Sequence, residues 1–153
     1  MVGRRYSGFT TQATGTGSTT AALWNLVGAT TTRVRIFDFI SGSEATPADN
    51  AFRFSFQRTT VNFGTPTAVT PVALDPADPA SLALFSTPGG TAVTATAGAI
   101  LLQLSHNQRA TFRWVAAPDS ELVIPATSAA GICLMPTISN ASVNVNHQVL
   151  WAE

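Results

Sequence analysis

Acidic residues and histidines are the side chains of this chain best suited to acid–base chemistry. The candidates are two close acidic pairs and the only two histidines: Asp75, Asp78, Asp119, Glu121, His106 and His147. A glycosidase needs two carboxyl groups that face one groove, with the pKa of one of them raised. Both acidic pairs instead flank proline turns, where an aspartate commonly accepts hydrogen bonds from its own backbone. We therefore expect turn residues at these positions and no enzymatic activity.

Phosphate, Schiff-base and metal chemistry lack the residues that they need. The stretch Gly15–Thr20 resembles a phosphate-binding loop, but a P-loop and a Schiff base both require a lysine. All eight basic residues of this chain are arginines. Two histidines and one cysteine match no recognised spacing of zinc ligands, and Cys133 lies in an apolar run that predicts a buried thiol. The sequence therefore predicts no cofactor and no metal.

The composition favours one charge-poor domain that works within an assembly. The chain has 153 residues, a formal net charge of zero and 10% charged residues, whereas about 25% is usual. A neutral chain is poorly suited to electrostatic capture of nucleic acid or of an anionic membrane. No apolar run approaches the roughly 20 residues that span a bilayer. We therefore expect protein partners, with no nucleic acid and no membrane.

The basic residues are four spaced pairs of arginines, namely Arg4/Arg5, Arg33/Arg35, Arg53/Arg58 and Arg109/Arg113. The planar guanidinium group of arginine is weakly hydrated and is readily desolvated at protein interfaces. A GC-rich coding sequence would produce the same preference for arginine over lysine. The composition leaves both explanations open.

The elements that must position these residues are β-strands that follow an N-terminal arm. Residues 1–20 are rich in Gly, Thr and Ser without a period, which predicts a flexible arm. Residues 21–153 contain about eight to ten short β runs separated by turns. Phe52, Phe54 and Phe56 alternate with polar residues, which predicts one buried face. We expect an all-β, antiparallel two-sheet sandwich, jelly-roll-like, with an extended N-terminal arm.

Strict alternation along the strands predicts which side chains are buried. In the run 33–40 it places Asp38 on an apolar face, where a carboxylate needs an arginine partner. It places Arg35, Phe37 and Phe39 on the opposite face, which is too apolar to be left in water. In the last strand it points His147 inward, as a partly buried and hydrogen-bonded side chain.

Three segments in the second half of the chain occur in a characteristic order. They are an aromatic strand at Phe112–Val115, the stretch Pro118–Pro125 and a glycine-led apolar strand at Gly131–Leu134. In this order they resemble the jelly rolls of small cement or decoration proteins of tailed-bacteriophage heads. The resemblance implies a homotrimer that binds the major capsid protein at three-fold or quasi-three-fold positions of an icosahedral shell. Such a protein is made in the host cytoplasm, lies on the outer surface of the virion and stabilises the shell without catalysis.

Two sets of contact residues are expected for such a protein. The capsid contacts on the predicted arm are Arg4, Arg5, Tyr6 and Phe9. The trimer contacts on the predicted apolar face are Arg35, Phe37 and Phe39.

Three other functions remain open at this stage. One is a carbohydrate- or receptor-binding jelly roll, such as a tail-fibre tip or a lectin-like module with a shallow groove. The exposed aromatic residue of that groove would be Trp24, Trp114 or Trp151. Another is a small capsid or spike subunit that builds the shell itself. An enzyme would need a deep pocket that holds Asp75 or Glu121 beside His106.

Overall fold

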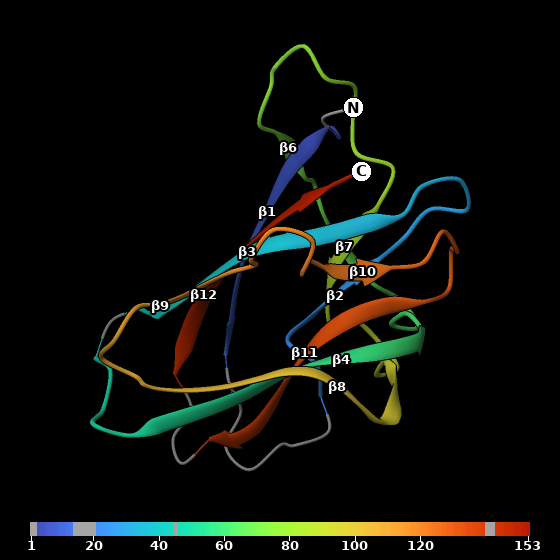
Figure 1. The fold of residues 1–153 in the computed structure, drawn as a ribbon. Coiled ribbons are helices and arrows are strands. Elements are labelled where there is room, and N and C mark those ends of the chain that lie inside the picture. Colours follow the sequence, from blue (N-terminus) through green and yellow to red (C-terminus); the bar gives the residue numbers. More distant parts are fainter. Residues whose placement is uncertain (1–2, 14–20, 45, 140–142) are drawn as a thin grey trace.

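Two antiparallel sheets face each other and enclose the hydrophobic core (Figure 1). The computed structural model describes residues 3–13, 21–44, 46–139 and 143–153, and no helix occurs within these ranges. The first sheet contains β1 (Arg5–Ala13), β3 (Val34–Ser43), β6 (Val72–Ala73), β9 (Phe112–Val115), β10 (Leu122–Ile124) and β12 (Asn144–Ala152). The second sheet contains β2 (Trp24–Val27), β4 (Ala51–Val61), β5 (Thr67–Val69), β7 (Leu84–Thr87), β8 (Thr94–Asn107) and β11 (Gly131–Ser139).

The chain crosses between the two sheets in the order of a jelly roll. β12 lies between β1 and β3, and β11 lies between β2 and β4, so the last two strands complete both sheets. β9 and β10 flank β3 in the first sheet, and β8 flanks β4 in the second. The short strands β5, β6 and β7 extend the sheets on the other side. This topology confirms the predicted all-β, antiparallel two-sheet sandwich of jelly-roll type.

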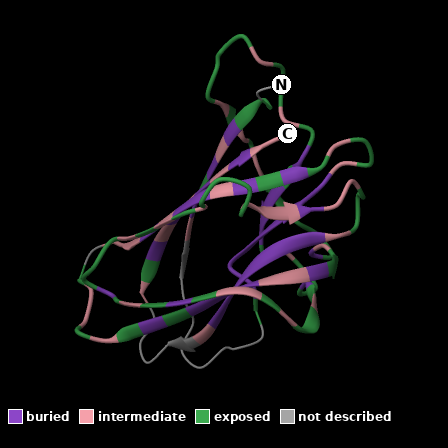
Figure 2. Ribbon diagram, viewed as in Figure 1, coloured by how far each residue is buried: buried purple, intermediate pink, exposed green. Residues whose placement is uncertain are grey.

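Aromatic side chains fill the space between the sheets. The ring centroids of Trp24 and Phe56 lie 5.5 Å apart, and those of Phe39 and Phe56 lie 4.9 Å apart in edge-to-face contact. Phe52, Phe54 and Phe56 are fully buried, which confirms the alternation predicted for β4. Every residue of β2 is also buried, so the middle of the second sheet is covered on both faces (Figure 2).

Strand β1 occupies residues that the sequence assigns to the flexible arm of residues 1–20. It pairs with β12 along its whole length and lies inside the first sheet. Tyr6 is fully buried, and its hydroxyl group donates a hydrogen bond to the carbonyl oxygen of Pro79 at 3.0 Å. The structure therefore differs from the prediction at residues 5–13. Residues 1–2 and 14–20 of the predicted arm lie outside the described residues.

After Tyr6, small residues carry the inward face of β1, which explains why its alternation is hard to recognise. Gly8 faces the core, and a Cβ atom there would lie 2.6 Å from Cδ1 of Phe85. Only glycine lets the strand approach the aromatic core this closely. Thr10 is 5% exposed. Because glycine and threonine replace the usual apolar residues, the segment resembles a linker in sequence.

A β-bulge in β3 reverses the alternation predicted for the run 33–40. The register between β3 and β12 shifts by one residue, so Phe37 is an extra residue in β3. Ile36 and Phe39 are both fully buried, although strict alternation places them on opposite faces. Phe39 packs in the core against aromatic rings of the second sheet. The prediction that Phe39 contacts another subunit is therefore wrong.

Candidate interaction surface

Three arginines surround a surface hollow of about 570 Å³ on the outer side of the first sheet. We call it the arginine hollow, and its lining residues are Gly3, Arg5, Arg33, Arg35, Phe37, Glu121, Ala152 and Glu153. Strand pairing brings them together, because Ala152 of β12 lies directly between Arg5 of β1 and Arg35 of β3. The small side chain of Ala152 leaves open the space between these two long side chains.

None of the three arginines forms an ion pair in the part of the chain that the structure describes. The ion pairs there join Arg4 to Asp78 and Arg113 to Asp38. The guanidinium group of Arg5 instead lies 5.5 Å from the centroid of the Phe37 ring, within the range of a cation–π contact. The hollow therefore presents several charged donors that no carboxylate of the described chain neutralises by direct contact.

Two glutamates also line the arginine hollow, but one of them binds elsewhere. The carboxylate of Glu153 accepts hydrogen bonds from the backbone amides of Leu82 and Ala83, at 3.0 and 3.1 Å. It also accepts bonds from Oγ of Ser81 at 2.5 Å and from Nε1 of Trp151 at 3.1 Å. These donors hold the carboxylate of Glu153 against the loop between β6 and β7. Glu121 is the other carboxylate in the lining.

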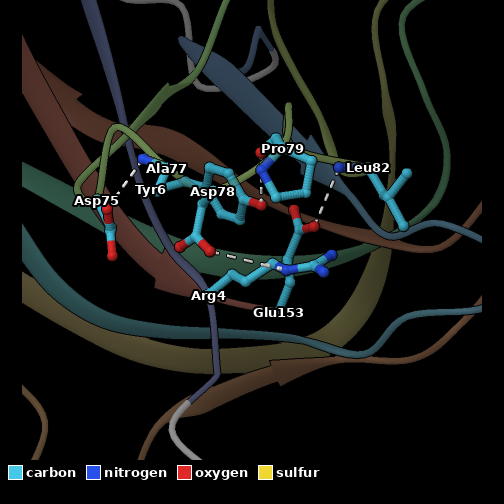
Figure 3. A network of polar contacts seen from close by, with 8 residues as sticks. All are labelled: Arg4, Tyr6, Asp75, Ala77, Asp78, Pro79, Leu82 and Glu153. Carbon is cyan, nitrogen blue, oxygen red and sulfur yellow. Dashed lines mark hydrogen bonds and ion pairs between the residues drawn. The ribbon is translucent and has the colours of Figure 1, made fainter.

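The loop between β6 and β7 lines a neighbouring hollow together with Arg4 and Arg5. Figure 3 shows how polar contacts fix this loop to Arg4, to Tyr6 of β1 and to Glu153. Nε of Arg4 lies 3.8 Å from Oδ1 of Asp78. Within the loop, Oδ1 of Asp75 accepts a hydrogen bond from the backbone amide of Ala77 at 2.9 Å. This bond confirms the turn role predicted for Asp75. The polar contacts therefore hold the loop beside the hollow.

A second, smaller hollow of about 270 Å³ lies farther along the outer face of the first sheet. We call it the amide hollow, and its lining residues are Phe9, Ile40, Gly42, Ser43, Thr111, Asn146 and Gln148. Gln148 of β12 lies between Phe9 of β1 and Ile40 of β3. Phe9 is 55% exposed. The outer face thus changes from cationic at one end to apolar and amide-bearing at the other.

The structure brings residues from both predicted contact sets onto this one face. Arg5 was expected to contact the capsid, and Arg35 and Phe37 were expected to hold the trimer, yet all three line the arginine hollow. Arg4 lies beside them, and Phe9 lines the amide hollow.

One further predicted contact residue is not accessible. Tyr6 is fully buried, so the prediction that its side chain contacts the capsid is wrong. Sequence reasoning also missed Arg33 and Ala152 as parts of the site. Arg33 is paired with Arg35 in the sequence but was not included among the predicted contact residues. Ala152 could not have been found, because its role depends on the pairing of three strands.

The tryptophans do not form the exposed platform expected for a carbohydrate-binding groove. Trp24 and Trp151 are fully buried, so that expectation is wrong for both. Trp114 is partly buried and packs against the core. At two of the three positions, the indole ring that would stack on a sugar is therefore buried in the core.

The predicted arginine partner of Asp38 is present. Arg113 of β9 forms a two-pronged contact with Asp38, from Nε to Oδ1 at 3.1 Å and from the terminal nitrogen to Oδ2 at 2.5 Å. Asp38 is 4% exposed, so the guanidinium group satisfies a carboxylate that is almost completely covered. This pair joins β3 to β9 at the edge of the first sheet.

Both histidines lie at aromatic contacts inside the sandwich and not in a hollow with a carboxylate. His106 stacks on Phe112 at a centroid distance of 5.5 Å, and His147 lies 5.6 Å from Phe39 and from Phe54. Among the residues that the structure describes, no group forms a hydrogen bond with a ring nitrogen of either histidine, so the predicted hydrogen bond of His147 is wrong. Burial, and to a smaller extent the neighbouring His106, lower the pKa of His147 to about 3.

The residues of the enzyme alternative are separated in the structure. Glu121 lines the arginine hollow, and Asp75 lines a neighbouring hollow with Arg4 and Arg5. His106 lines neither of these two hollows. Neither hollow therefore combines a carboxylate with a histidine.

Cys133 has the buried environment that its apolar neighbours predict. The thiol is free and buried, and burial raises its pKa to about 12. A thiol with so high a pKa carries almost no thiolate near neutral pH.

Among residues 3–13, 21–44, 46–139 and 143–153, no three histidine, cysteine or acidic side chains are grouped to hold a metal ion. The same ranges contain no helix with the length and apolar character needed to cross a bilayer. Comparisons of the chain with protein-family models, with curated proteins and with solved structures give no match.

Proposed function

We propose that this protein is a structural virion protein that decorates the outside of a bacteriophage head as a homotrimer and stabilises the shell. The single observation that carries the proposal is the outer face of the first sheet, where unneutralised arginines and exposed apolar side chains share one surface. A surface of this composition suits burial against another protein, since arginine and aromatic residues are enriched in interface cores. The jelly-roll topology and the resemblance of three segments to phage decoration proteins support the same function.

The two hollows suggest a division of contacts along the face. The arginine hollow would bind the major capsid protein, because its charge allows discrimination between partners. The amide hollow would pack against a neighbouring subunit of the trimer, because Phe9 and Ile40 offer apolar area flanked by amide groups. Three copies of one capsid-binding site in a trimer would then act together, so each contact could be weak.

Two measurements test this proposal. Light scattering of the purified protein should give the mass of a trimer at micromolar concentration. Electron microscopy of the protein mixed with empty phage heads should show added density at three-fold positions outside the shell. A monomer that leaves the heads undecorated would contradict the proposal. Closed particles formed by the isolated protein would instead favour a shell-building subunit.

A further inference from the structure

We infer that the arginine hollow binds an acidic, extended segment of a partner protein, in which carboxylates occupy alternate positions and so face the hollow together. The inference rests on the proposed function in one respect only, namely that the major capsid protein supplies this segment. The hollow itself is the binding site, and its ligand chemistry follows from Arg5, Arg33, Arg35 and Phe37.

The charged groups favour carboxylates as the ligand. Arg5, Arg33 and Arg35 lack ion-pair partners among the described residues, and guanidinium groups bind carboxylates through paired hydrogen bonds. The carboxylate of Glu153, although it lines the hollow, is already bound by four donors. A bound segment would therefore give these arginines the partners that the described chain does not.

The modest excess of positive charge argues against a nucleic acid. Three arginines line the hollow together with Glu121 and Glu153, so the local charge suits one or two carboxylates. A nucleic acid carries one phosphate charge about every 1.7 Å of duplex, and Glu121 would repel such a dense polyanion. Phe37 also lines the hollow, where its ring offers apolar contact area to the aliphatic stem of an acidic side chain.

The strand spacing favours an extended ligand. Arg5 and Arg35 lie on strands that are separated only by β12, so their backbones are about 10 Å apart. In an extended peptide, side chains on one face repeat about every 7 Å. The flexible arginine side chains can cover the remaining distance on both sides of Ala152. Two carboxylates at alternate positions can therefore each meet one guanidinium group.

The test uses a short fluorescein-labelled peptide with alternating acidic and leucine residues, and fluorescence anisotropy at low salt. The full-length protein should bind this peptide, and the same peptide with amide side chains should not bind. An Arg33→Gln/Arg35→Gln double variant should lose about tenfold or more in affinity, because charge-assisted contacts are lost. The matched control is Arg53→Gln/Arg109→Gln, which removes the same charge from exposed positions outside the hollow. This control should bind the peptide as the unmodified protein does.

Three results would overturn the inference. The first is no peptide binding, and the second is equal loss of affinity in both double variants. The third is tighter binding of an oligothymidylate that depends on Arg33 and Arg35. Decoration of phage heads is measured separately, so that the two proposals can fail independently. A protein that binds the peptide but never decorates heads refutes the proposed function alone, whereas one that decorates heads without binding the peptide refutes the inference alone.

Discussion

At the scale of single residues, His147 couples the stability of the fold to pH. Its ring is fully buried and has no hydrogen-bond partner within the described parts of the chain, and burial together with the nearby His106 lowers its pKa from 6.5 to about 3. The unfolded chain therefore binds a proton in a pH range where the folded chain does not. It follows that the free energy of unfolding falls as the pH falls from about 6.5 towards 3. The loss for one proton is at most about 1.4 kcal/mol per pH unit.

Urea unfolding between pH 7.5 and pH 4, run on the protein and on a His147→Phe variant, measures this contribution. Phenylalanine keeps an aromatic ring beside Phe39 and Phe54 but cannot take up a proton. The variant should lose less stability on acidification, while carboxylates elsewhere contribute equally to both proteins. Equal pH dependence in the two proteins would show that His147 is not the group responsible.

Gly8 provides a second test at this scale. A Cβ atom at Gly8 would lie 2.6 Å from the Phe85 ring and 3.0 Å from the Trp151 ring. Gly8→Ala should therefore lower the free energy of unfolding by about 1–3 kcal/mol through overpacking. Gly42→Ala is the matched control, because a Cβ atom there would meet its nearest neighbour, Oγ1 of Thr111, at an ordinary 3.5 Å. Chemical denaturation of both variants should separate them, and equal stability would argue against the close approach of β1 to the core.

At the scale of elements, the bulge in β3 decides which aromatic residues are available to a partner. Phe39→Ala should lower the free energy of unfolding by about 3–5 kcal/mol, because it empties a fully buried position. Phe37→Ala should cost less, since the Phe37 ring lies at the surface hollow. Denaturant titration of both variants measures the difference. Similar losses for the two variants would mean that β3 follows the strict alternation seen in its sequence.

The same elements show how far sequence reasoning reaches. The alternation of Phe52, Phe54 and Phe56 predicts β4 and its buried face correctly, because large apolar residues mark it directly. The strand at residues 5–13 is missed, because Gly8 and Thr10 carry its inward face. The bulge at Phe37 cannot be predicted from β3 alone, because it exists only relative to the register of β12.

The candidate site depends on strand pairing in the same way. Arg5 and Arg35 can each be recognised in the sequence as exposed cations near aromatic residues. Their common hollow is created by Ala152, which lies between them only because β12 is inserted between β1 and β3. Residues from three distant parts of the chain therefore form one surface, and no local pattern relates them.

At the scale of the whole molecule, the sheet edges differ in how well they are protected against pairing with another chain. The edge strands β5, β6 and β10 have three, two and three residues, and prolines lie close to them in the sequence. The edge strand β8 has 14 residues and contains neither a proline nor a charged Asp, Glu or Arg. Proteins usually protect edges with short strands, prolines and charges. We therefore expect β8 to be the edge at which further association begins.

A lysine on this edge should suppress that association. Gln103 is exposed on β8, so Gln103→Lys adds a charge at the unprotected edge without disturbing the core. Light scattering at rising protein concentration should show less growth beyond the proposed trimer for this variant. Asn144→Lys adds the same charge on β12, which has neighbours on both sides, and should leave the growth unchanged. Equal suppression by both variants would contradict the role of the β8 edge. It would show that the added net charge of this otherwise neutral protein reduces association wherever the lysine lies.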